Sequence, residues 1–209
     1  MSYLKKTALV SCVACALALP VTATADDHMI KASNIIYSDI TNGLNTFGRI
    51  ENVLLNRNSD AVEYLFFETS NTFRPVSNTK GFVEISNVKF NADAGGKLQV
   101  LVKDTNAQRK PQELEVTHKE AEYRLVSKIL DEYIMFSDQQ MRQIDDILID
   151  RKTGKIKYFT VDMATDGFFS DDIRAIPADE VHIKWSGQVK SSASLTDVSS
   201  HKKYQMGSM

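Results

Sequence analysis

Beyond its first 25 residues the chain has no cysteine, because Cys12 and Cys15 both lie in the amino-terminal segment. A chain that loses this segment cannot use a thiol for catalysis or bind an iron–sulfur cluster through cysteine. The sequence also lacks the phosphate-binding glycine loops, the G-x-S-x-G elbow and the H-E-x-x-H motif of common enzyme classes. With no catalytic set visible, we expect a protein that is not an enzyme and that has no cofactor.

Long hydrophobic runs are confined to the amino terminus. "MSYLKK" is basic, "TALVSCVACALAL" is apolar, and "ATA" before Asp26 has the small residues of a cleavage site. These three parts are typical of a secretory signal peptide over residues 1–25, cut after Ala25, and the apolar run is too short to span a bilayer. A lipoprotein signal ending at Cys12 is disfavoured, since only "TALVS" separates that cysteine from Lys6. We therefore expect a periplasmic or secreted protein with no membrane span in the mature chain.

Charge of one sign is not concentrated anywhere in the sequence. Of 25 basic residues, Lys5 and Lys6 leave with the signal peptide, so 25 − 2 = 23 remain against 27 acidic residues, a net charge of −4. A mildly acidic chain without a basic stripe is a poor ligand for nucleic acid or for an anionic membrane. We expect no nucleic-acid partner; the expected partner is another protein or complex of the cell envelope.

The sequence repeats itself at an offset of 94 residues. "IENVLLNRNSDAVEYLFFE" at 50–68 aligns without gaps to "IDDILIDRKTGKIKYFTVD" at 144–162. The repeat predicts a tandem pair of small domains, at 30–103 and 122–186, joined by a polar linker at 104–121.

Each copy alternates apolar and polar residues with a period of two. Val53 and Leu55 in the first copy, like Ile147 and Ile149 in the second, are flanked by amides or carboxylates, and turn residues follow. Several short strands of this kind predict a mainly β protein built from two small antiparallel β-barrels. Residues 187–209 have too little apolar content to offset the entropy of ordering, which predicts a disordered tail.

Three aspartates, Asp145, Asp146 and Asp150, fall in the second copy of the hairpin. An acid–base or metal site needs carboxylates that converge. Alternation places Asp146 and Asp150 on one face but well apart, and Asp145 on the other. The first copy has Asn52 and Asn56 at matching positions, which cannot do acid–base work. We therefore interpret the aspartates as the solvated face or the turn of a hairpin.

Four segments of the second copy form a recognisable pattern. They are "SKIL" at 127–130, "IDDILID" at 144–150, "YFTVD" at 158–162 and "IPADEV" at 176–181. This pattern resembles the PRC-barrel domain, which occurs in a subunit of purple bacterial photosynthetic reaction centres and in a ribosome maturation factor. The first copy, at 33–90, resembles it more distantly and keeps Gly48, where the second copy has Arg142. The resemblance implies two PRC-barrel-like domains that dock onto other proteins, and its motifs are structural rather than catalytic.

Adjacent aromatic residues suggest a contact surface. Phe168 and Phe169 follow Gly167 in an expected loop, and two neighbouring rings cannot both enter one barrel core. One ring is expected either to pack between the domains or to bind a partner, and Phe73 lies in a similar place in the first copy.

Histidine offers one metal-binding possibility. Cleavage after Ala25 would leave Asp26-Asp27-His28 at the amino terminus, where the amine, two amides and the imidazole can hold Cu(II) or Ni(II) in a square plane. The alternative is an amino-terminal tail without function. His182, in the expected closing strand, is interpreted as structural, and His201, in the tail, as solvated.

These observations support two hypotheses of different classes. The first is an exported, non-enzymatic protein-binding or scaffold module built from two PRC-barrel-like domains. The second is a periplasmic carrier of a small ligand or of copper or nickel, with the ligand in a barrel interior, in an inter-domain cleft or at the amino terminus.

Overall fold

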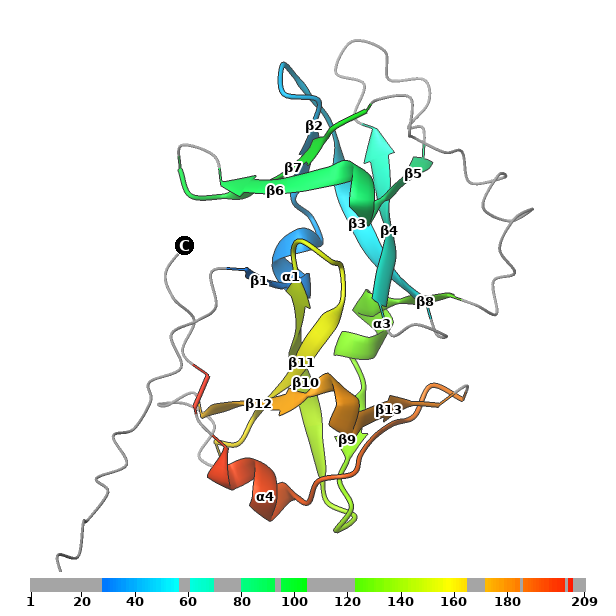
Figure 1. Ribbon diagram of the computed structural model, residues 1–209. Coiled ribbons are helices and arrows are strands. Elements are labelled where there is room, and N and C mark those ends of the chain that lie inside the picture. Colours follow the sequence, from blue (N-terminus) through cyan, green and yellow to red (C-terminus); the bar gives the residue numbers. More distant parts are fainter. Residues whose placement is uncertain are drawn as a thin grey trace, which may run out of the picture.

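The computed structural model describes residues 28–56, 61–69, 80–92, 95–104, 123–164, 172–184, 186–201 and 203–204. Strands predominate, as the period of two predicts, and they form two sheets that lie one above the other in Figure 1. The mainly β fold class is therefore confirmed. No helix among the described residues is long and apolar enough to cross a membrane.

The first sheet belongs to the first copy of the repeat and has the strand order β5-β4-β3-β2-β7-β6. In chain order, the elements of the first copy are β1 (Met29–Lys31), α1 (Ala32–Ile35), β2 (Asp39–Thr41), β3 (Thr46–Asn56), β4 (Ala61–Thr69), β5 (Lys80–Glu84), η1 (Ile85–Asn87), β6 (Val88–Ala92) and β7 (Leu98–Val102).

The second sheet repeats this arrangement in the order β12-β11-β10-β9-β14-β13. In chain order, the elements of the second copy are β8 (Tyr123–Leu125), α3 (Val126–Leu130), β9 (Tyr133–Met135), β10 (Met141–Asp150), β11 (Ile156–Asp162), β12 (Ile173–Pro177), η4 (Ala178–Glu180), β13 (Val181–Ile183), β14 (Val189–Ser191) and α4 (Leu195–Ser200). Element by element, the second copy follows the order of the first and ends in one additional helix.

The expectation of closed antiparallel barrels is wrong on two points. Both sheets are mixed, because β2 pairs parallel with β7 and β14 pairs parallel with β9. Neither sheet closes on itself in the part of the chain that the structure describes. The opening falls where a 3₁₀ turn, η1 or η4, interrupts strand pairing and leaves the strands on either side of it at opposite ends of the sheet.

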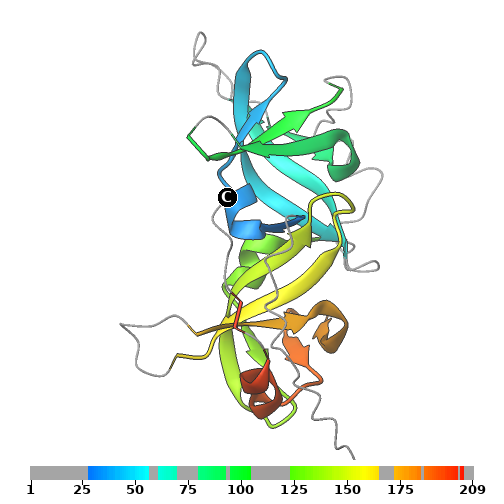
Figure 2. The same ribbon diagram turned by 60° about the vertical axis from the view of Figure 1, so that its left-hand side comes forward.

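The two halves exchange their first strands. β1, which opens the first copy, pairs with β10 of the second, and β8, which opens the second copy, pairs with β3 of the first. The helices that follow lie at the junction of the halves, where α1 packs on β10 and on β3, and α3 packs on β3 and on β10, as Figure 2 shows. The larger hydrophobic core then runs through both halves, from Ile35 and Ile50 in the first to Ile129 and Ile144 in the second.

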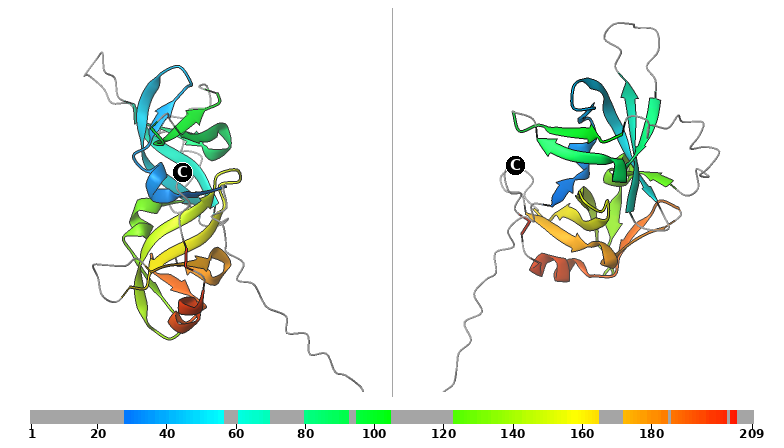
Figure 3. Two further views of the ribbon diagram at one scale, coloured as in Figure 1. Left: turned by 90° about the vertical axis from the view of Figure 1, so that its left-hand side faces the viewer. Right: turned by 45° about the horizontal axis from the view of Figure 1, so that its top comes forward.

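The carboxy-terminal segment is ordered over most of its length, which corrects the prediction of a disordered tail at 187–209. β14 pairs with β13 and β9, and α4 packs on β12 (Figure 3). Leu195 and Val198 of α4 are buried, and Ser194 and Asp197 form a capping box at its start. Few apolar residues suffice here because those present fall at core-facing positions. Residues 205–209 lie outside the described part.

Candidate functional site

A buried carboxylate lies where the two halves meet. Asp146 on β10 is only 2% exposed, and its Oδ1 accepts hydrogen bonds from the backbone N–H of Ser33 at 3.2 Å and of Ile147 at 2.8 Å. The Ser33 hydroxyl donates to Oδ2 of the same carboxylate. Ser33 lies in the first turn of α1, where backbone N–H groups have no partner within the helix. Asp146 therefore satisfies a helix start that belongs to the other half of the chain.

The same contact occurs a second time with the halves exchanged. Oδ1 of Asn52 on β3 accepts from the N–H of Ser127 at 3.2 Å and of Val53 at 2.9 Å. The Asn52 amide donates to the Ser127 hydroxyl at 2.6 Å. An amide thus does in one contact what a carboxylate does in the other, so the contact needs acceptor oxygens rather than acid–base chemistry.

A β-bulge brings Asp145 and Asp146 toward one cation. The register of β10 against β11 shifts between Ile144 and Asp146, so strict alternation fails there. Lys31 Nζ lies 3.7 Å from Asp145 Oδ2 and 3.9 Å from Asp146 Oδ2, and Thr160 donates to Asp145 at 3.0 Å. The expectation that the two carboxylates point to opposite faces is wrong, as is the solvated position expected for Asp146.

Asp150 has the turn-stabilising position that the sequence predicts. Its Oδ1 accepts from the backbone N–H of Lys152 at 2.9 Å and of Thr153 at 3.0 Å. Partial burial raises the pKa of Asp150, but the hydrogen bonds from Thr153 and Lys152 outweigh it and leave the pKa below its ordinary value. The aspartates of this hairpin therefore act as acceptors for the fold.

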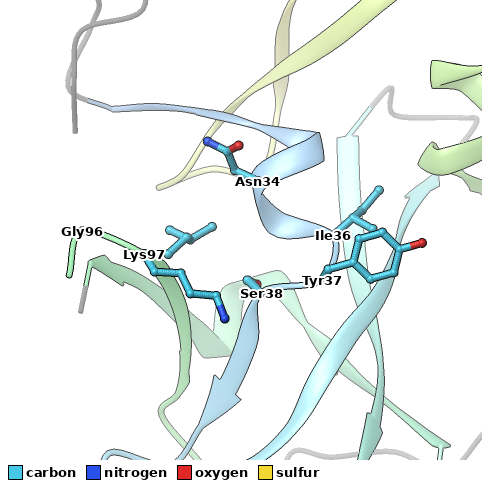
Figure 4. Close-up of a pocket in the computed structure, with 7 residues that line it drawn as sticks. Asn34, Ile36, Tyr37, Ser38, Gly96 and Lys97 are labelled. Carbon is cyan, nitrogen blue, oxygen red and sulfur yellow. The ribbon is translucent and has the colours of Figure 1, made fainter. Parts of the chain in front are cut away.

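A pocket of about 310 Å³ lies between α1 and the hairpin of β6 and β7 (Figure 4). The residues that line it are Asn34, Ile36, Tyr37, Ser38, Gly96, Lys97 and Leu98. The Lys97 ammonium lies 3.0 Å from Asp39 Oδ2, and the Ser38 hydroxyl donates to the carbonyl of Ile35 at 2.7 Å. Two of the polar groups are thus already engaged, and the volume is at the lower end of the range for small-ligand sites.

A second surface lies on the outer side of β9, β10, β13 and β14. Met135 pairs with Met141 on one side and with Lys190 on the other, and His182 pairs with Lys190. Cross-strand partners point to the same side of a sheet, whereas Ile134 on the opposite side is fully buried. We call this surface the Lys–Met face; its residues are Tyr133, Met135, Met141, Gln143, His182, Lys184, Gln188 and Lys190.

The Lys–Met face exposes large apolar side chains. Tyr133 is 52% exposed and Met141 is 50% exposed, although most large hydrophobic residues of the chain are buried. His182 is exposed in β13, where it pairs with Lys190. Partial loss of hydration and the positive charge of Lys184 lower the pKa of Lys190. This surface combines exposed apolar area with crowded cations.

The aromatic residues predicted for docking cannot be placed. Phe168, Phe169 and Phe73 all lie outside the described residues. They stay predictions, and so does the surface that they would form.

The predicted amino-terminal metal site is described only at its last member, since Asp26 and Asp27 lie outside the described residues. His28 Nε2 lies 3.0 Å from Lys152 Nζ, and its Nδ1 is buried without a hydrogen-bond partner. No group of three or more His, Cys, Asp or Glu residues within the described ranges could hold a metal ion. His201, predicted to be solvated, is half-buried, with Nδ1 3.2 Å from the carbonyl of Ala175.

Sequence reasoning missed the Lys–Met face because its strands are short. β9, β13 and β14 have three residues each, too few for a periodic signal. The available signal was the triplet "YIM" at 133–135, in which an isoleucine separates two residues that both face outward.

Comparison with known proteins leaves the chain without an assigned family. No protein-family model matches the sequence, and no curated protein matches it either.

Proposed function

We propose that the protein is an exported, non-enzymatic protein-binding or scaffold module built from two PRC-barrel-like halves, which acts in the periplasm or outside the cell. The observation that carries this proposal is the Lys–Met face. It presents Tyr133 and Met141 to solvent on neighbouring strands of the second sheet.

The composition of this face is that of an interaction surface. Tyrosine and methionine are enriched where proteins bind one another, and exposed apolar residues that cluster on one surface indicate binding. Methionine side chains also adapt their shape to different partners. The face is held by a sheet whose inner side, including Ile134 and Val189, is fully buried, so the surface needs little ordering when a partner binds.

The remaining parts of the proposal rest on the sequence. Signal peptide, cleavage after Ala25 and export follow from the amino-terminal pattern. The PRC-barrel resemblance of 127–181 favours docking over catalysis. The roles of Asp145, Asp146 and Asp150 as hydrogen-bond acceptors agree with a protein whose carboxylates serve its fold.

Site-specific photo-crosslinking in the living cell tests protein binding. A photoreactive phenylalanine analogue at Tyr133 is expected to give a defined adduct. The same analogue at Leu44, which is 89% exposed in the turn between β2 and β3, should not give that adduct. Met141→Ser should reduce the adduct at position 133. Equal adducts at both positions, or none at position 133, would contradict the proposal.

The pocket beside α1 favours a second candidate function, carriage of a small ligand. Asn34→Trp would fill the pocket without touching the core, since Asn34 is only half-buried. Native mass spectrometry of protein isolated from its own host should then show a bound mass in the wild type that the variant lacks. If the wild-type protein shows no bound mass, carriage of a small ligand is excluded.

The metal form of the second candidate has a separate test. Copper titration followed by visible absorption should show square-planar binding in the processed protein and none in His28→Ala. The His28 ring lies next to Lys152, so copper binding would require the ring to turn away from that lysine. Lys152→Ala removes this contact and should therefore strengthen copper uptake. Equal uptake by wild type and His28→Ala would exclude the site.

A further inference from the structure

The Lys–Met face has a charge that the rest of the protein does not share. The whole chain has a net charge of −2, yet the residues of this face include two lysines and a histidine and no carboxylate. The local charge is therefore opposite in sign to that of the molecule. A surface of this kind attracts negatively charged partners and orients them.

The two lysines of the face lie on the same side of one hairpin, because Lys190 pairs with His182 and Lys184 follows His182 by two residues. Partial loss of hydration and the charge of Lys184 both lower the pKa of Lys190, which agrees with two neighbouring ammonium groups on this hairpin. Neither lysine forms an ion pair with any described residue. Two like charges held side by side are stabilised by a carboxylate placed between them.

A third cation, Arg124 on β8, contacts this hairpin. The Arg124 guanidinium donates to the carbonyl of Lys184 at 2.9 Å and to that of Gly187 at 3.3 Å. These bonds anchor the turn between β13 and β14 to β8, which itself pairs with β3 of the first half. The cationic edge of the face is therefore fixed in position before a partner arrives.

Cationic and apolar residues occupy different strands of the face. The lysines lie on or next to β13 and β14, whereas Tyr133, Met135 and Met141 lie on β9 and β10. A ligand that crosses the strands meets positive charge first and apolar surface second.

We propose that the partner binds through an acidic segment that also carries large apolar side chains. Its carboxylates would contact Lys184 and Lys190, and its apolar residues would pack on Tyr133, Met135 and Met141. This inference rests on the proposed protein-binding function and specifies the chemistry of the partner.

A membrane or a nucleic acid fits the same face less well. Near an anionic membrane each lysine strengthens binding only about fivefold, and the face has two. Nucleic-acid binding depends on many phosphate contacts and commonly uses six or more cations. The exposed tyrosine and methionines instead need an apolar counterpart, which an acidic peptide segment with leucine or phenylalanine provides.

Fluorescence anisotropy with defined probes tests the inference. The probe is a fluorescein-labelled peptide, Glu-Leu-Asp-Phe-Glu-Leu-Asp, titrated with the purified protein. Saturable binding that weakens with added salt is expected. One altered probe carries glutamine and asparagine in place of its acids, and another carries serine in place of its leucines and phenylalanine. Each should bind about tenfold more weakly, since each lacks either the charged or the apolar half of the contact.

Variants of the protein locate the binding surface. Lys184→Gln with Lys190→Gln should weaken binding of the acidic probe about five- to tenfold, and Tyr133→Ser with Met141→Ser should do the same. The matched control is Lys89→Gln with Lys155→Gln, which removes the same charge from exposed positions off the face and should change little. Circular dichroism would verify that each variant is folded.

Several outcomes would overturn the inference. They are no binding of the probe, equal loss in the control variant, and stronger binding to phosphatidylglycerol vesicles or oligo(dT) than to the peptide. A crosslink at Tyr133 that survives Lys184→Gln with Lys190→Gln would reject the acidic partner while leaving the proposed function intact. If position 133 gives no crosslink and the peptide does not bind, the acidic partner and the proposed protein-binding function are both rejected.

Discussion

The hydroxyl of Ser33 donates a hydrogen bond to the buried carboxylate of Asp146, 113 residues further along the chain. Ser33 belongs to the first copy of the repeat and Asp146 to the second, and Asn52 and Ser127 form the equivalent contact in reverse. The two contacts hold each short helix against the strand of the other half. The interface between the halves is thus specified by polar contacts as well as by the shared core.

Removal of the Asp146 carboxylate should destabilise the whole protein. Asp146→Ala leaves the N–H groups of Ser33 and Ile147 without their acceptor in a buried site, which costs roughly 2–3 kcal/mol. Asp146→Asn should cost less than about 1 kcal/mol, because Asn52 makes the equivalent contact with an amide. Urea unfolding monitored by circular dichroism would compare the two. Equal stability of Asp146→Ala and the wild type would refute the structural role.

A glycine at the tip of the second hairpin should tolerate no side chain. Gly154 has a φ of +71°, and a Cβ there would lie 2.8 Å from the carbonyl oxygen of Val62 in the other half. Gly96 is the matched control, since its φ is +80° but a Cβ there meets nothing within 4 Å. Gly96→Ala should cost about 1 kcal/mol through backbone strain alone, and Gly154→Ala clearly more. Similar melting temperatures for the two variants would show that the contact with Val62 is unimportant.

The carboxy-terminal helix should loosen in acid. Hydrogen bonds from Ser194 lower the pKa of Asp197 below its ordinary value of 3.8. A lowered pKa in the folded state means that the cap stabilises α4 above the unfolded pKa, and that this stabilisation is lost as pH falls through the folded pKa. Carboxyl NMR titration should detect the lowered pKa and its return toward 3.8 in Ser194→Ala. An unchanged pKa in that variant would exclude the capping box.

Gly48 and Arg142 occupy equivalent strand positions, yet they should respond differently to substitution. A Cβ at Gly48 would lie 2.4 Å from the carbonyl oxygen of Glu68 on β4. In the second half β11 ends at Asp162, before it reaches Arg142, so a side chain fits there. Thermal unfolding should therefore show Gly48→Ala destabilised by about 1–3 kcal/mol and Arg142→Gly changed by less than about 1 kcal/mol. The reverse order would contradict the pairing.

The sequence predicted the strands and their repetition because both are local or periodic signals. The alternation around Val53 and Ile147 indicated β structure, and the offset of 94 residues indicated duplicated elements. Neither signal contains the β-bulge at Ile144 and Asp146. A bulge changes which face each later residue occupies, so alternation placed Asp146 in solvent although it is buried.

Other features depend on which segments meet in space. Nothing in the sequence of β1 indicates that it pairs with β10 rather than with β3, because any short extended segment can complete an open sheet edge. The ordered tail was missed for a similar reason. Its burial depends on the positions of Val189, Leu195 and Val198 against surfaces made elsewhere, and composition alone does not contain that information.

The exchange of first strands also sets the order in which a chain can fold as it leaves a channel amino terminus first. β3 gains β8 only after Leu125 has emerged, and β1 has no partner until β10 is complete at Asp150. The first half therefore cannot finish its sheet while the second is still in transit. We expect a chain that emerges amino terminus first to remain open until late and then to close both halves together.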